Sequence, residues 1–151
     1  MFEKEKIQLG INKSIVLEDF DRFWMITSGV VDIYYANIGE DGAHKSTLKH
    51  LYRAKQGELL FSLQTEPKGP GIKLIATSAK ATLMGINKNK LVDINHTFLK
   101  QLIDKWVLKT INALHQTNIP RIYKALNGNQ TISLKENEIA YPYKGLVWCL
   151  I

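Results

Sequence analysis

Two apolar runs meet at a serine–glycine pair early in this 151-residue chain. Phe23 to Thr27 and Val30 to Ala36 are rich in the aromatic and β-branched residues that favour β-strands. Glycine adopts the positive φ of a tight turn without strain, so Ser28-Gly29 between the two runs predicts a β-hairpin. Strands that begin this early and follow each other this closely constrain the first half of the chain to an all-β architecture.

Further short strands are expected after this hairpin. The segments that predict them are Leu48 to Arg53, Leu59 to Leu63, Ile72 to Ala76 and Ala81 to Ile86. A turn at Gln56-Gly57 and two loops at residues 37–46 and 64–71, which hold most of the glycines and prolines of this half, separate these segments. Because no helix of useful length fits before residue 90, the closely spaced strands predict a mainly β jelly-roll or β-roll.

The apolar period changes to three and four residues near residue 97. One face of the expected helix carries Phe98, Leu99, Leu102, Ile103, Trp106, Val107, Ile111 and Leu114. The opposite face carries Lys100, Asp104, Lys105 and Lys109. This pattern predicts an amphipathic α-helix from Thr97 to Gln116, with Asn95 or Thr97 as its N-cap. The apolar stripe is expected to pack on its own domain, and its width also permits a homodimer through this helix.

The pattern returns to short strand-like pieces after Pro120. Thr131 to Leu134, Glu138 to Ala140 and Leu146 to Ile151 are the expected strands. We therefore divide the chain into a β-roll with its helix, residues 1–116, and additional strands, residues 117–151. An apolar strand at the end of a chain needs a partner. It either pairs back into the roll or begins a second unit of a longer protein.

The composition of the chain limits its expected location and its expected partners. The net charge is +6, but the excess is nearly all lysine, because Arg22, Arg53 and Arg121 are the only arginines. Phosphate and base recognition favours the planar guanidinium group, so nucleic acid is not an expected partner. No apolar run reaches the roughly 18 residues of a membrane span. The N-terminus does not resemble a secretion signal, and a single cysteine excludes an internal disulfide, so a cytoplasmic location is expected.

The strand order and turn motifs resemble the cyclic nucleotide-binding domain superfamily. The residues that carry the resemblance are Trp24, Ile26, Ser28, Gly29, Val31 and Ile33, followed by Gly57-Glu58. The resemblance covers roughly residues 20–116 and implies a cyclic nucleotide-binding-like β-roll. In ligand-binding members, a segment of the type F-G-E-x-A follows, whose glutamate takes the ribose hydroxyl, and an arginine then pairs with the cyclic phosphate.

This chain departs from the superfamily at those ligand residues. Leu60 to Leu63 has serine and leucine where glycine and glutamate are expected, and no arginine occurs between residues 64 and 73. Lys68 and Lys73 are the only cations there. Loss of the bidentate donor removes a charge-assisted interaction with the phosphate, so cyclic AMP and cyclic GMP are not expected ligands.

A narrower set of motifs is similar to the N-terminal region of ABC transporters that export peptide natural products with nitrile-hydratase-like leaders. Trp24, Ser28, Gly29, Val31, Asp32 and Ile33 match the first motif, and Gly57 to Phe61 the second. This resemblance implies a docking domain at the inner face of the membrane, with other transporter domains or a leader peptide as partners. The chain contains no Walker-type loop, so ATP hydrolysis cannot occur within it.

No catalytic constellation emerges from the remaining residues. A cupin, which shares the double-stranded β-helix, needs two histidines two residues apart on one strand, whereas His44 and His50 are six apart. Cys149 lies in an apolar segment, where a thiol is usually buried and inert. Asp32 is a single carboxylate in a strand, expected at an edge or paired with lysine. We therefore expect a non-enzyme without metal or cofactor.

These observations lead to one expected function and two alternatives. We expect a non-catalytic regulatory or docking domain, with a sensor of a small ligand other than a cyclic nucleotide, or a cupin-like metalloenzyme, as the alternatives. The residues expected to contact a partner or ligand are Gly57, Glu58, Phe61, Ser62, Lys68 and Lys73.

Overall fold

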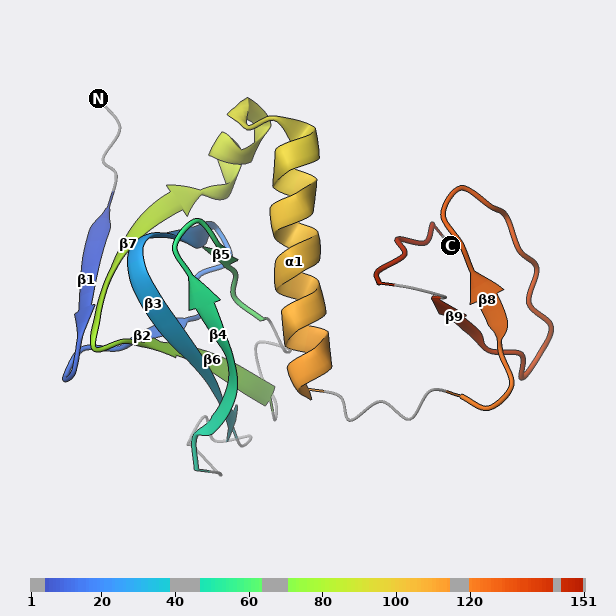
Figure 1. The fold of residues 1–151 in the computed structure, drawn as a ribbon, viewed down its shortest axis with the longest axis horizontal. Coiled ribbons are helices and arrows are strands. Elements are labelled where there is room, and N and C mark those ends of the chain that lie inside the picture. Colours follow the sequence, from blue (N-terminus) through green and yellow to red (C-terminus); the bar gives the residue numbers. More distant parts are fainter. Residues whose placement is uncertain (1–4, 39–46, 64–70, 115–119, 143–144, 151) are drawn as a thin grey trace.

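The computed structural model describes residues 5–38, 47–63, 71–114, 120–142 and 145–150 (Figure 1). In these ranges, seven strands form one curled antiparallel sheet with a helix beside it. The strands are β1 (Lys6–Gly10), β2 (Ile15–Leu17), β3 (Arg22–Ile38), β4 (Lys49–Lys55), β5 (Leu59–Leu60), β6 (Gly71–Thr77) and β7 (Lys80–Asn87). The sheet order is β1-β7-β3-β6-β2, with β4 and β5 also paired to β3.

Strand β3 organises the roll because it pairs with four other strands. Its first half, residues 22–29, pairs with β7 and β5, and its second half, residues 30–38, pairs with β4 and β6. The single strand therefore bends through both halves of the curled sheet, as Figure 1 shows. This arrangement is the mainly β, cyclic nucleotide-binding-like roll that the strand spacing and the turn motifs predict.

The predicted hairpin at Ser28-Gly29 is wrong, because the chain bends there without reversing. Gly29 has a φ of +84°, and the pairing with β7 shifts register between Ile26 and Ser28. A β-carbon at Gly29 would lie 2.4 Å from the carbonyl oxygen of Lys80 and 2.9 Å from Cα of Ala81. The glycine therefore serves a bulged corner, where one strand passes close to the turn between β6 and β7.

The interior of the roll is filled by side chains from most of its strands. Alternation places Val31 and Ile33 inside, fully buried, while Asp32 between them faces outward. The buried cluster comprises Leu9, Leu17, Trp24, Ile26, Val31, Ile33, Ala54, Leu60, Leu74, Ala76, Ala81 and Leu83. Burial of these apolar side chains is the main stabilisation of the roll.

Most of the predicted strands of the first half are confirmed. β4, β6 and β7 lie where the sequence predicts them, and Gly57 has the positive φ, +85°, of the expected turn. β5 is shorter than the predicted segment Leu59 to Leu63. β1 was not predicted, and β2 coincides with a short apolar patch. The predicted loops at residues 37–46 and 64–71 lie largely outside the described residues. Their described ends belong to strands, because β3 continues to Ile38 and β6 begins at Gly71.

The predicted helix is confirmed as α1 (His96–Leu114), which follows the 3-10 helix η1 (Lys88–Asp93). The Asn95 side chain accepts a hydrogen bond from the backbone N–H of Phe98 at 3.1 Å, so Asn95 is the N-cap. α1 contacts β4 and β5 and covers that side of the roll (Figure 1). The predicted end at Gln116 lies outside the described residues. No helix among the described residues is long and apolar enough to cross a membrane.

The C-terminal region contains a separate two-stranded parallel sheet, β8 (Lys124–Leu126) with β9 (Ala140–Pro142). The strands predicted at Thr131 to Leu134 and at Leu146 to Ile151 are wrong in their described residues, which form no strand. They find no neighbouring strand, and Leu134 and Leu150 remain exposed. Cys149 is exposed rather than buried, which corrects the expectation from its apolar neighbours.

Candidate functional site

The turn between β4 and β5 is held firmly against strand β3. The backbone N–H of Gly57 donates to the carbonyl of Ile26 at 2.8 Å, and the N–H of Ile26 donates to the carbonyl of Glu58 at 3.1 Å. A β-carbon at Gly57 would meet nothing within 4 Å, so only the positive φ requires glycine here. The turn therefore fixes the backbone of Glu58 at the edge of the roll.

The Glu58 carboxylate is buried and bound by two lysines of α1. Only 8% of Glu58 is exposed. Its Oε1 lies 3.0 Å from Nζ of Lys105, and its Oε2 lies 2.5 Å from Nζ of Lys109. Lys109 also donates to the carbonyl of Arg53 at 3.1 Å. We call Glu58, Lys105 and Lys109 the junction cluster, because it joins the β4–β5 turn to the helix.

The electrostatics of the junction cluster favour the charged carboxylate. Burial raises the pKa of Glu58, but hydrogen bonds and charges from Lys109 and Lys105 outweigh it and hold the pKa below the usual value. Breaking such a buried pair is costly, because it leaves a charge without compensation. The position of α1 is therefore coupled to the position of the β4–β5 turn.

Aromatic side chains continue the contact from the roll into α1. The rings of Phe23 in β3 and Phe61 stack with centroids 5.5 Å apart. Phe61 then meets Trp106 of α1 edge-on, with centroids 5.2 Å apart. The indole Nε1 of Trp106 is buried and has no hydrogen-bond partner among the described residues. The Tyr52 hydroxyl nevertheless interacts with this indole, so the N–H faces a polar neighbour at the junction.

A second polar contact lies beside Trp106. The hydroxyls of Thr110 and Tyr52 are 3.5 Å apart, and Thr110 also donates to the carbonyl of Trp106 at 2.9 Å. Burial raises the pKa of Tyr52, which therefore stays a neutral phenol. The junction thus combines two ammonium groups, aromatic surface and neutral hydroxyls within one contact between β4, β5 and α1.

The structure brings three of the predicted contact residues to this junction. Gly57, Glu58 and Phe61 lie at it, as described above. Ser62 instead donates to the carbonyl of Asp19 at 2.9 Å, and Lys73 lies 3.4 Å from the carboxylate of Glu18. These two residues therefore face the segment between β2 and β3. The last predicted residue, Lys68, lies outside the described residues.

The residues that complete the junction from α1 were not predicted as site residues. Lys105 and Lys109 were placed on the polar face of the helix, opposite the roll, but both reach back to Glu58. Long lysine stems allow this, because the apolar part of the side chain covers neighbouring surface while the ammonium group finds a partner. A spacing of four between two lysines was the only available signal, and it is common on solvated helices.

The outer face of β3 and β4 carries a second charged group. Asp32 accepts hydrogen bonds from Nε and Nη2 of Arg53, at 2.8 and 3.0 Å, and lies 3.0 Å from Nε2 of His50. The hydrogen bond from Arg53 is the main reason that the pKa of Asp32 is low. Asp32 is therefore engaged with the Arg53 guanidinium and the His50 ring rather than poised as a base. His44, the other histidine considered for a metal site, lies outside the described residues.

No group of three histidine, cysteine, aspartate or glutamate side chains in the described part of the chain is arranged to hold a metal ion.

No protein-family model and no curated protein matches this sequence. Among solved structures, oxidised CprK in complex with o-chlorophenolacetic acid is similar, with 16% identity, a TM-score of 0.50, and coverage of 74% of this chain and 45% of that chain. Reduced CprK without a ligand matches with 18% identity, a TM-score of 0.49, and coverage of 76% and 55%. The chain thus spans about half the length of the CprK chains, and at this identity the first likeness supports the fold alone.

Proposed function

We propose that this chain is a non-catalytic, ligand-sensing regulatory domain, in which the roll receives a signal and α1 transmits it. The observation that supports this proposal best is the junction cluster. Its buried carboxylate, Glu58, belongs to the roll, and both of its counter-charges belong to the helix. A ligand that displaces the β4–β5 turn would change both ion pairs and thereby the position of α1 on the roll.

The chemistry at the junction favours a small aromatic acid as the ligand. Phe61 and Trp106 offer aromatic surface beside the two ammonium groups of the junction cluster. A ligand carboxylate would compete with Glu58 for Lys105 and Lys109. CprK, whose fold is similar, was solved with o-chlorophenolacetic acid. The absence of an arginine between residues 64 and 73 speaks against a cyclic phosphate.

We further propose that the output is pairing of two copies through α1. Ile111 and Leu114 of the helix are 39% and 36% exposed, on a side that the roll does not cover. The finer role that the transporter motifs imply, docking to other transporter domains or to a leader peptide, rests on those motifs alone. It predicts a partner rather than a small ligand.

Thermal unfolding in the presence of chosen probes tests the proposal. We expect o-chlorophenolacetic acid, at concentrations up to about 1 mM, to raise Tm by a few degrees. Cyclic AMP and cyclic GMP should leave Tm unchanged. Replacement of both junction lysines, Lys105→Met with Lys109→Met, should remove the response to the aromatic acid, whereas Lys73→Met should preserve it.

Three outcomes separate the alternatives. Stabilisation by cyclic AMP alone would overturn the inference from the missing arginine. An unchanged response in the double lysine variant would move the ligand away from the junction. No response to any of the three probes would count against sensing of this ligand class and favour the docking role.

A further inference from the structure

Helix α1 has an outer face that the roll leaves uncovered. The outer face is defined by Lys100, Ile103, Asp104, Val107, Ile111 and Leu114. These residues recur at intervals of one, three and four and so form one stripe of the helix. Trp106 and Lys109, which contact the roll, lie on a different side. The stripe is apolar toward the C-terminal end of α1 and polar at Lys100 and Asp104.

The C-terminal segment of the chain lies on the first half of this outer face. Trp148 Nε1 donates to Oδ1 of Asp104 at 2.8 Å, across 44 positions of sequence. A mainly apolar groove of about 330 Å³ lies between the indole and α1, and its α1 lining includes Leu99 and Ile103. The contact therefore combines one hydrogen bond with adjacent apolar surface.

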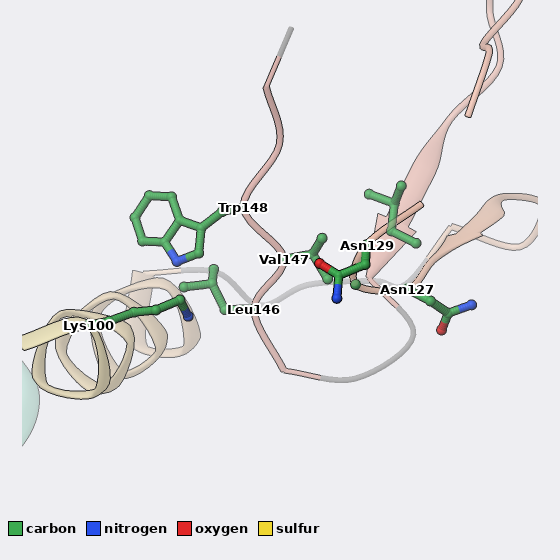
Figure 2. A pocket seen from close by; sticks show the side chains of 8 residues that line it. Lys100, Asn127, Asn129, Leu146, Val147 and Trp148 are labelled. Carbon is green, nitrogen blue, oxygen red and sulfur yellow. The ribbon is translucent and has the colours of Figure 1, made fainter. Parts of the chain in front are cut away.

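A second cavity lies behind the same segment. It measures about 360 Å³, and Figure 2 shows Lys100 of α1 on one side, Leu146 to Trp148 along it, and Asn127 and Asn129 opposite. In this view the Trp148 ring lies over the start of the helix and next to Leu146. The segment is thus set between α1 and the turn after β8, with room around it.

The contact of Trp148 with α1 is limited to one hydrogen bond and partial burial of the indole. Trp148 remains 59% exposed, and one hydrogen bond to a carboxylate anchors it. Asp104 also accepts from Lys100 at 2.6 Å, so its carboxylate stays satisfied when the indole leaves. The second half of the outer face continues beyond the indole, and Ile111 and Leu114 there are 39% and 36% exposed.

We propose that residues 146–148 form an intramolecular latch on the outer face of α1, which must release before a second copy of the chain can pair with that helix. The occupant of the face in the closed state is Trp148, and the competitor is the same stripe of another copy. Apolar residues at intervals of three and four along one helix suit pairing with an identical helix. Closure lowers the fraction of chains competent to pair, and the apparent pairing affinity falls by the same factor. This inference rests on the pairing through α1 proposed above.

The latch itself can be observed without reference to pairing. Cys149 is the single cysteine of the chain, is exposed, and adjoins Trp148. A nitroxide attached to it should broaden the amide signals of residues 100–104 in dilute protein. Trp148→Ala and Asp104→Ala should abolish the broadening, and Leu150→Ala, at a fully exposed neighbouring position, should preserve it. Absence of broadening in the labelled parent chain would mean that the latch is open in solution and would overturn the proposal.

Sedimentation equilibrium then tests the competition. Trp148→Ala and Asp104→Ala should pair at least about tenfold more tightly than the parent chain. Leu150→Ala should match the parent. Weaker pairing of Trp148→Ala would place the indole in the dimer interface and overturn the latch, as would an unchanged affinity or a monomer in every variant.

A separate variant distinguishes failure of the latch from failure of the proposed function. Ile111→Asp, in the uncovered half of the outer face, should abolish pairing in the parent and in Trp148→Ala. If pairing persists in Ile111→Asp, the dimer forms elsewhere and the proposed output through α1 fails. The broadening experiment would in that case still report whether Trp148 closes on α1.

Discussion

Replacement of Glu58 by glutamine removes the single negative charge of the junction cluster with almost no change in side-chain volume. Lys109 is the main partner, with 29% of its side chain exposed, and a hydrogen bond between charged groups contributes about 1.5–3 kcal/mol. Lys105 is 54% exposed, so its pair adds about 0.5 kcal/mol. Lys109 keeps the carbonyl of Arg53 as an acceptor, which limits the loss. We expect Glu58→Gln to lower the free energy of unfolding by about 2–3 kcal/mol.

A double-mutant cycle isolates the contribution of the pair. Urea unfolding followed by far-UV circular dichroism gives the free energies for Glu58→Gln, Lys109→Met and the combined variant. The combined loss should fall short of the sum of the single losses by about 1–2 kcal/mol, because each single change already breaks the same pair. Glu18→Gln with Lys73→Met is the matched control, since those side chains are 63% and 41% exposed and should couple by less than about 0.5 kcal/mol.

Additive losses would refute the reasoning. If the two changes at the junction sum to within about 0.3–0.5 kcal/mol, the ion pair contributes no coupling in solution. The helix would then be held by its other contacts with the roll, such as Phe61 with Trp106 and Lys109 with the Arg53 carbonyl. In that case α1 could not report a displacement of the β4–β5 turn through Glu58. A smaller m-value in the variants would instead indicate that α1 has separated from the roll before global unfolding.

Three further predictions concern the corner, the helix start and pH. Gly29→Ala should lower the free energy of unfolding in urea by about 3 kcal/mol, because the positive φ and the contact with the backbone of Lys80 act together. Gly57→Ala, with nearly the same φ but open space around the new methyl group, should lower it by about 1 kcal/mol. Equal losses in the two variants would contradict the close approach at Gly29. Asn95→Ala should lower the free energy of unfolding by about 1 kcal/mol through loss of the N-cap, and restoration by Asn95→Asp would attribute the loss to the capping oxygen. The folded-state pKa of Glu58 is below its ordinary value of 4.5. The stabilisation that the charged carboxylate gives the fold is therefore complete above about pH 4.5 and is lost as pH falls through the folded-state pKa. The decrease of Tm between neutral and acid pH should accordingly be smaller in Glu58→Gln than in the parent chain.

The fold was largely predictable because it follows from local patterns. Local sequence patterns predict the secondary structure of these elements: β-branched and aromatic runs predict β3, β6 and β7, and the helical period of apolar residues predicts α1. The corner at Gly29 was not predictable, because a hairpin and a bulged corner demand the same positive φ from glycine. What distinguishes the two is the neighbour across the sheet, which lies about 50 positions later in the chain.

The candidate site was predictable only from the roll's side. Gly57-Glu58 stood out as a turn motif, and Phe61 followed in an apolar segment. The burial of Glu58 depends on α1, whose two lysines lie about 50 positions later in the chain. A single sequence does not reveal which lysines of an amphipathic helix turn toward a buried carboxylate, because their stems allow either direction. The hydrogen bond between Trp148 and Asp104 was not predictable for the same reason, because it depends on a tertiary contact between distant segments.

The buried ion pairs at this junction add little net stability, but they couple the position of α1 to the position of the β4–β5 turn. The desolvation of Glu58 offsets much of its attraction to Lys105 and Lys109, so apolar residues would hold α1 at least as well. Apolar contact, however, weakens gradually as surfaces slide, whereas loss of a lysine leaves a buried charge uncompensated at once. The roll interior is already filled by side chains such as Ile33 and Leu74, so a ligand there is not needed for folding. Under the proposed function, a displacement of the β4–β5 turn would therefore act on a contact whose free energy changes steeply with distance, and α1 would respond to it.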